Sequence, residues 1–166
     1  LGPILDSFKA DYKKYCASCP LATMDMPITS VGKDSTDRII SYLRAHKDVN
    51  YVVMSVDVMG IGFPAALKAA GLDGKVKFAG HSPSVENLGY IDQGLQGATV
   101  NQDYYAVMAT LIDGAARKMV GLPTTPDNKW SIPYFIESKG HLASTTGFGP
   151  VMPDFYGQLK KLWGKK

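Results

Sequence analysis

Tyr51-Val52-Val53-Met54-Ser55-Val56-Asp57 decides the fold, because it is an apolar strand that ends in a polar residue directly before a helical pattern. The same arrangement returns at 75–82 and at 97–103. Strands that alternate with helical patterns are typical of βαβ units and a parallel sheet. We therefore predict an α/β fold, a parallel sheet whose right-handed crossovers place helices on both faces.

The rest of the chain continues this alternation. Apolar residues recur at helical spacing in 3–15, 35–45, 59–70, 84–94, 103–120 and 154–163, and further strands are predicted at 21–26 and 132–137. Ser84 is placed to cap its helix. Residues 123–129 are the one candidate linker, and 140–152 are predicted as loop. We find no repeat of fixed period.

The composition is that of an ordinary globular domain. The chain has 166 residues, of which 45% are hydrophobic and 20% are charged, and a formal net charge of +3. Several lysines lie close together at the C-terminal end. A nucleic-acid-binding protein, however, needs Lys and Arg distributed over the whole surface that contacts the nucleic acid. We therefore expect no nucleic-acid partner. No apolar run approaches the ~20 residues that span a membrane, and the opening Leu-Gly-Pro leads us to expect a start within a longer protein.

No motif for catalysis stands out. The chain has no nucleophile elbow, phosphate loop or metalloprotease helix. Gly60-Ile61-Gly62 follows Asp57 within a helical pattern, so it is not a dinucleotide fingerprint, and no pair of facing carboxylates can be nominated for glycoside hydrolysis. Since ligands of open parallel sheets sit at the carboxyl ends of the strands, we expect binding of a small molecule without enzyme activity, and no cofactor.

Cys16 and Cys19 are the only cysteines, in the run Cys16-Ala17-Ser18-Cys19-Pro20. A zinc site needs about four ligands, and the three histidines show no spacing that would complete one. A redox pair needs a thiol at a helix N-terminus, whereas Cys16 follows a predicted helix. A structural disulfide is the favoured hypothesis and free thiols are the remaining one. A disulfide would favour an oxidising compartment outside the cytoplasm.

Three segments resemble the type I periplasmic binding proteins, the family of ribose-type sugar receptors and of the effector domains of lac-repressor-like regulators. The first segment is 52–62 together with 65–71, and the second is 76–83. The third is 98–103, which leads into the long helix and is followed after that helix by Gly121 and Pro123. The closing segment 155–164 is similar to the tail of bacterial solute receptors.

The resemblance implies that residues 1–166 form a single α/β lobe, the second of two. In this division 1–101 are the lobe core, 102–136 are the crossing strand, the long helix and the return strand, and 137–166 are the C-terminal loop and helix. The N-terminal lobe would be missing. The wide apolar stripe of helix 103–120 would then pack on that lobe or on a second copy of the chain.

The resemblance also implies a ligand site at the strand ends. Sugar-binding relatives offer Arg, Asn, Asp and Gln at positions that fall here on Ile4, Val56, Ser82 and Gln102. Only Gln102 keeps the family residue. Because Ile4 and Val56 cannot pair with sugar hydroxyls, and an unpaired buried hydroxyl costs ~1–3 kcal/mol, we expect a ligand with a larger apolar face or fewer hydroxyls than a simple pentose or hexose.

The candidate ligand-binding residues are Gln102, Asp57, Val56, Ser82, His81 and Asp25. Gln102 is favoured, because the crossing strand would place it at the floor of the cleft. Three of the others have an alternative role without ligand contact. For Asp57 this role is helix capping, for His81 it is that of an ordinary loop residue, and for Ser82 it is to begin a turn before Pro83. Asp25 would close the predicted strand 21–26 at the crevice edge, or lie on the surface. No metal ligands are nominated.

The implied function is that of the solute-binding component of an ABC importer, periplasmic or extracellular and membrane-anchored. Two lobes would close on a carbohydrate or a less polar relative and deliver it to the permease. The alternatives are an effector-binding domain of a lac-repressor-like regulator, the receptor part of a sensor, and an enzyme on the same fold.

Overall fold

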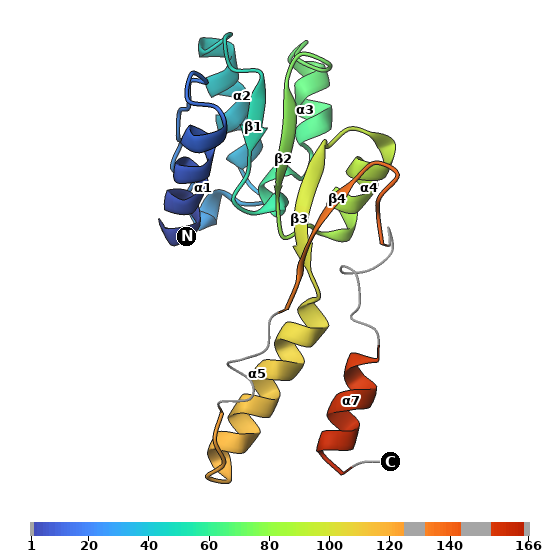
Figure 1. The fold of residues 1–166 in the computed structure, drawn as a ribbon. Coiled ribbons are helices and arrows are strands. Elements are labelled where there is room, and N and C mark those ends of the chain that lie inside the picture. The colour runs from blue at the N-terminus through green and yellow to red at the C-terminus, as the bar shows by residue number, and fades with distance from the viewer. Residues whose placement is uncertain (1, 125–131, 144–153, 165–166) are drawn as a thin grey trace.

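A four-stranded sheet forms the centre of the computed structural model, which describes residues 2–124, 132–143 and 154–164. The strands lie in the order β1-β2-β3-β4 and are β1 (Tyr51–Val53), β2 (Lys77–His81), β3 (Ala98–Gln102) and β4 (Tyr134–Ser138). β1, β2 and β3 are parallel, whereas β4 is antiparallel to β3. Helices flank the sheet (Figure 1), so the predicted α/β class is confirmed.

The helices mostly follow the predicted pattern. They are α1 (Gly2–Tyr15), α2 (Ser35–Ala45), α3 (Phe63–Ala69), α4 (Val85–Gln93), α5 (Tyr104–Met119) and α7 (Phe155–Leu162), with short 3-10 turns η1 (Ile28–Ser30) and η2 (Asp57–Gly60). The single helix predicted for 59–70 is wrong. It is divided into η2 and α3, because Gly62 adopts a left-handed φ of 79° between them, a conformation that glycine adopts without strain.

The strand predicted at 21–26 is also wrong. These residues form neither helix nor strand and are mostly exposed. A strand needs a neighbour for its backbone groups, and in the described sheet β1 pairs with β2 alone. Asp25 therefore lies on an exposed irregular segment outside the sheet. Of the predicted loops, residues 125–129 and 144–152 lie outside the described residues.

The main core lies where α2 and α3 pack against one face of the sheet. Its buried members are Ile39, Ile40, Leu43, Met54, Met59, Phe63, Leu67, Val76 and Phe78. The rings of Phe63 and Phe78 meet edge to face, with centroids 5.1 Å apart, an arrangement that favours aromatic pairs. This core fixes the start of α3 against β2 and so holds η2 at the end of β1.

The two faces of the sheet differ in exposure, since successive side chains of a strand point to opposite faces. Phe78, Thr99 and Glu137 share the buried face. Val53 and Ile136 lie on the opposite face and are exposed. The pairing of the strands places His81, Val100 and Gln102 on this more open face.

A helical arm leaves the sheet after β3 (Figure 1). In it, α5 packs on α7 through a small buried cluster of Ala106, Ala109, Phe155 and Leu159. The indole N–H of Trp163 donates to the Asp113 carboxylate at 2.5 Å, and Arg117 pairs with the same carboxylate at 2.6 Å. The other side of α5 exposes Met108, Leu111 and Ile112. None of the described helices is long and apolar enough to cross a membrane.

Candidate ligand site at the strand ends

The carboxyl ends of β1, β2 and β3 lie at one edge of the sheet, where parallel strands gather ligand contacts. Val56 and Asp57 follow β1, with Val56 directly before η2. His81 ends β2 and pairs with Val100, two residues before Gln102 at the end of β3. The structure thus brings five of the six predicted ligand residues to one edge. Asp25 is the one that lies outside the sheet.

His81 and Ser82 form a fixed pair at the end of β2. The Ser82 hydroxyl and Nδ1 of His81 share a hydrogen bond of 2.6 Å. The Ser82 backbone has a φ of 61°, a left-handed conformation that costs free energy in a residue other than glycine, and its N–H donates to the carbonyl oxygen of Val100 at 2.9 Å. The neighbouring strand β3 therefore holds the strained turn at Ser82, whose hydroxyl is bonded to the His81 ring.

Tyr134 is a candidate site residue that the sequence pattern did not predict. It begins β4 and pairs directly with Gln102 in the antiparallel register. Its ring lies 6.2 Å from the His81 ring between centroids, and 65% of the residue is exposed. A strand was predicted at 132–137, but nothing in the sequence fixes which residue of a return strand faces Gln102.

Asp57 lies beneath the edge rather than on it. The residue is fully buried, and within the described residues neither carboxylate oxygen has a hydrogen-bond partner. Burial raises the pKa of the Asp57 carboxyl, and the nearby Thr99, Gln96 and His81 side chains only partly oppose this effect. The capping alternative for Asp57 is wrong, because the N-cap positions of η2 and α3 are Val56 and Gly62.

Asn87 connects the turns that follow β1 and β2, and it too was missed. Its Nδ2 donates to the backbone oxygen of Asp57 at 3.0 Å and to Oε1 of Gln96 at 3.2 Å. Its Oδ1 accepts from the N–H and the hydroxyl of Ser84 at 3.1 and 2.6 Å. The predicted Ser84 cap is confirmed as part of a capping box. No sequence signal pointed to the contact with Asp57, thirty residues away.

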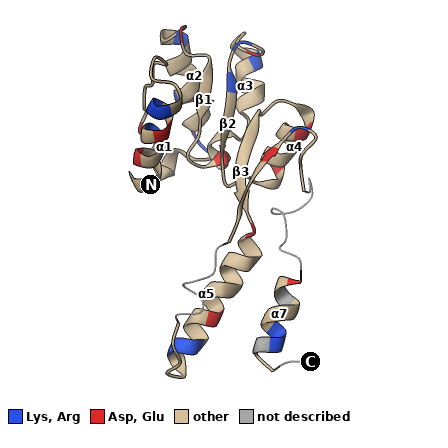
Figure 2. Ribbon diagram, viewed as in Figure 1, with Lys and Arg blue, Asp and Glu red and all other residues tan. Residues whose placement is uncertain are grey.

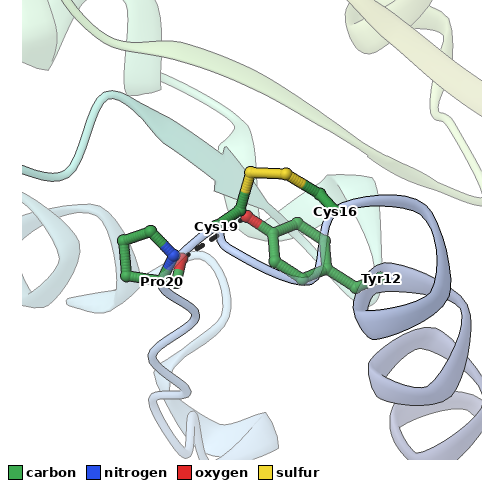
Figure 3. Close-up of a disulfide and its surroundings, with 4 residues drawn as sticks. All are labelled: Tyr12, Cys16, Cys19 and Pro20. Carbon is green, nitrogen blue, oxygen red and sulfur yellow. Dashed lines mark hydrogen bonds between the residues drawn. A yellow bond between two sulfur atoms is a disulfide. The ribbon is translucent and has the colours of Figure 1, made fainter.

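Cys16 and Cys19 come together in the turn after α1, as the disulfide hypothesis requires. Their Cα atoms are 5.3 Å apart, within the range for a disulfide, and Figure 3 shows the two sulfur atoms bonded. The Tyr12 hydroxyl donates to the Pro20 carbonyl oxygen at 3.4 Å across the same turn. The pair thus fixes the path of the chain away from α1.

The acidic residues of the strand ends, Asp57 and Asp103, are both buried. No Lys or Arg occurs in 54–57, 81–84 or 101–103, and Figure 2 shows basic residues mainly on the helices. Within the described residues no group of three or more His, Cys, Asp or Glu is arranged to hold a metal ion. Two hollows of about 330 and 400 Å³ border α2 and α3, and neither is lined by a candidate ligand residue.

The comparison with protein families gives one match. Residues 29–123 fit the model described as periplasmic binding protein domain. This segment includes β1, β2, β3 and the whole of α5. No curated protein sequence matches the chain significantly.

Several of the solved structures with the same fold are binding proteins for small solutes. The Caulobacter myo-inositol binding protein, bound to myo-inositol, is 26% identical over 64% of this chain and 36% of its own, with a TM-score of 0.56. The 5-methylthioribose transporter solute binding protein from Thermotoga lettingae, in complex with 5-methylthioribose, is 19% identical over 95% of this chain and 54% of its own, with a TM-score of 0.72.

An ABC transporter solute binding protein from Agrobacterium vitis, with bound D-fucose, is 20% identical over 79% of this chain and 44% of its own, with a TM-score of 0.61. The chain therefore spans between 36% and 54% of the length of these three structures. It has the fold of one part of a sugar-binding periplasmic protein.

Proposed function

Because this chain belongs to the periplasmic binding protein family, we propose that it is the C-terminal lobe of the solute-binding protein of an ABC importer. Its strand-end edge binds a neutral, sugar-like molecule and leaves it chemically unchanged. The observation that carries the proposal is the meeting of His81, Ser82, Gln102 and Tyr134 at one edge of the sheet, where the strand ends have no Lys or Arg.

The ligand class follows from the side chains at this edge. The Gln102 amide and the His81 imidazole provide hydrogen-bonding groups, whereas Val56 and the Tyr134 ring provide apolar surface. The solved relatives were determined with myo-inositol, D-fucose and 5-methylthioribose, all small and neutral. We assign this chain a ligand with fewer hydroxyls or a larger apolar face than D-ribose, for which 5-methylthioribose is a suitable probe.

A second lobe completes the site in this proposal. Residues 1–101 form the lobe core, and 102–136 contain the two strands that join the lobes. The exposed apolar side of α5, with Met108, Leu111 and Ile112, supports this division, because an apolar patch of this kind marks an interface. The missing lobe covers it, or a second copy does when that lobe is absent. Closure of the lobes traps the solute through contacts made only in the closed state.

The place of action is outside the cytoplasm. The solute-binding members of the family are extracytoplasmic proteins, and the Cys16–Cys19 pair supports an oxidising compartment. We propose a periplasmic or membrane-anchored extracellular receptor that delivers its solute to a permease. The lac-repressor-like alternative gains no support from the three solved structures described above.

Titration calorimetry on the full-length protein containing this chain tests the proposal with three probes: D-ribose, myo-inositol and 5-methylthioribose. We expect 5-methylthioribose to bind about tenfold more tightly than D-ribose, since one unpaired buried hydroxyl has about this effect. Equal or tighter binding of D-ribose would overturn the ligand class. Binding of none of the three, with no solute retained in native mass spectrometry of the purified protein, would overturn the function.

A further inference from the structure

Asn87 is a fully buried side chain that belongs to α4 but touches both turns of the candidate site. One hydrogen of its Nδ2 bonds the backbone oxygen of Asp57, in the turn after β1. Its Oδ1 accepts two bonds from Ser84, in the turn after β2. A single planar carboxamide therefore fixes the turn that carries Val56 relative to the turn that carries Ser82.

A second connection runs from the same carboxamide to β3. The other hydrogen of Nδ2 bonds Oε1 of Gln96 at 3.2 Å, and Nε2 of Gln96 donates to the carbonyl oxygen of Ala98 at 3.2 Å. Gln96 is also buried. Since a primary amide has two N–H donors, Asn87 uses both of them, and its two bonds are directed to different elements.

The burial of these groups makes the geometry exacting. A buried polar group that loses its partner cannot bond to water instead. The loss of free energy is then larger than the net contribution of the bond itself. Two neighbours hold Asp57 in place: Asn87 bonds its backbone oxygen, and its carboxyl group is enclosed behind Gly80. A shift of Asn87 would move the turn after β1 against the turn after β2.

We propose that Asn87 is a positioning residue for ligand binding: it holds the turns at 56–57 and 82–84 at the spacing that the ligand requires, without touching the ligand. The inference rests on the proposed function. The competing view is that Asn87 serves only the capping box at the start of α4, in which Ser84 and Asn87 are equal partners.

Three variants separate the two views. Asn87→Asp has nearly the same shape and keeps an acceptor for Ser84, but it loses both Nδ2 donors. Asn87→Ala removes the carboxamide without adding a buried charge, and therefore serves if Asn87→Asp does not fold. Ser84→Ala is the matched control, because it removes the hydroxyl bond of the cap but leaves the bond from the Ser84 N–H and the bonds to Asp57 and Gln96 in place.

Amide hydrogen exchange on the 166-residue chain gives a readout that needs no ligand. The reporter is the Met59 amide, which donates to the Val56 carbonyl oxygen at 3.1 Å within the turn after β1. We expect its exchange to become about tenfold faster in Asn87→Asp and Asn87→Ala, the effect of losing one directed bond. In Ser84→Ala only the first amides of α4 should exchange faster.

The consequence for binding is measured on the full-length protein with 5-methylthioribose, by calorimetry. We expect an affinity about tenfold lower in both Asn87 variants and unchanged in Ser84→Ala. Unchanged Met59 exchange in the Asn87 variants, or an equal increase in Ser84→Ala, would overturn the positioning role. Faster exchange with unaltered affinity would show that the turn spacing does not serve binding. If the wild type binds no probe sugar, the proposed function fails while the exchange result still decides the positioning.

Discussion

The Asp57 carboxyl group lies behind β2 in the space that a side chain at Gly80 would need. A β-carbon built on Gly80 would lie 2.0 Å from Oδ1 of Asp57 and 3.0 Å from the backbone oxygen of Met54. Any other residue at position 80 would thus displace both a buried side chain and a strand end. The absence of a side chain at Gly80 is what allows Asp57 to be enclosed beneath the site.

The first prediction concerns this close approach. Gly80→Ala should lower the free energy of unfolding by about 1–3 kcal/mol, the usual effect of overpacking a core. Urea denaturation followed by circular dichroism measures it. Gly89→Ala is the control, because the nearest atom to its new β-carbon is the Gln93 side-chain nitrogen at 3.9 Å, and alanine in a helix is favoured over glycine by about 1 kcal/mol. Equal stability of Gly80→Ala and the wild type would contradict the packing described here.

The second prediction concerns the pH dependence of stability. Because burial raises the folded-state pKa of Asp57 above its unfolded value, the folded protein holds this proton more tightly than the unfolded chain. The contribution to stability is therefore complete below the unfolded pKa and declines as pH rises through the folded pKa. Asp57→Asn removes this decline.

Urea unfolding between about pH 4 and about pH 8 should show Asp57→Asn becoming more stable relative to the wild type as the pH rises. Asp25→Asn is the matched control, since it makes the same substitution at an exposed residue. A stability difference for Asp57→Asn that stays constant with pH would mean that burial does not raise the pKa of this carboxyl.

The third prediction concerns the cysteines. Iodoacetamide should modify neither Cys16 nor Cys19 before reduction and both after it, as read by intact mass spectrometry under denaturing conditions. A Cys16→Ser, Cys19→Ser double variant should lose about 2 kcal/mol of stability, the effect of opening a short loop. Two modified thiols in the unreduced protein would remove the support for an oxidising compartment.

The fourth prediction concerns the exposed apolar side of α5. Size-exclusion chromatography with light scattering should show the isolated 166-residue chain associating as its concentration increases. Leu111→Glu should reduce this association, because it places a charge in the apolar patch. Leu95→Glu is the control, since Leu95 is also exposed but lies between α4 and β3. A monodisperse wild-type monomer at all concentrations would show that the α5 patch does not self-associate.

The fifth prediction concerns Tyr134. If its ring provides an apolar surface for the ligand, Tyr134→Ala should weaken 5-methylthioribose binding by about tenfold, and Tyr134→Phe should keep most of it. Calorimetry on the full-length protein measures both. Tyr105→Ala is the control, because Tyr105 is an exposed tyrosine on α5. Full affinity in Tyr134→Ala would place the ring outside the site.

Much of the fold could be predicted from the sequence, because its signals are local. Apolar strands followed by helical patterns predicted β1, β2 and β3 within a few residues of their observed bounds. The caps and C-terminal glycines of the helices were equally visible, as at Ser84 and Gly94. The strand at 21–26 failed because a strand depends on a neighbour that an apolar pattern does not supply.

The geometry of the candidate site could be predicted less completely, because it depends on long-range contacts. The strand ends pointed to His81, Ser82 and Gln102, since parallel topology alone brings them to one edge. Tyr134 depends on the register of a return strand after a long helix, and Asn87 depends on a bond to a turn thirty residues earlier. The sequence also could not show that the Asp57 carboxyl faces the sheet interior rather than solvent.

The pairing of Gln102 with Tyr134 has a mechanical consequence. These residues lie on the two adjacent strands at the point where both leave the sheet for the helical arm. If the proposed lobes close about these two strands, a ligand held by either side chain would contact the hinge itself. In that case ligand binding and lobe closure would be coupled without any intervening residues.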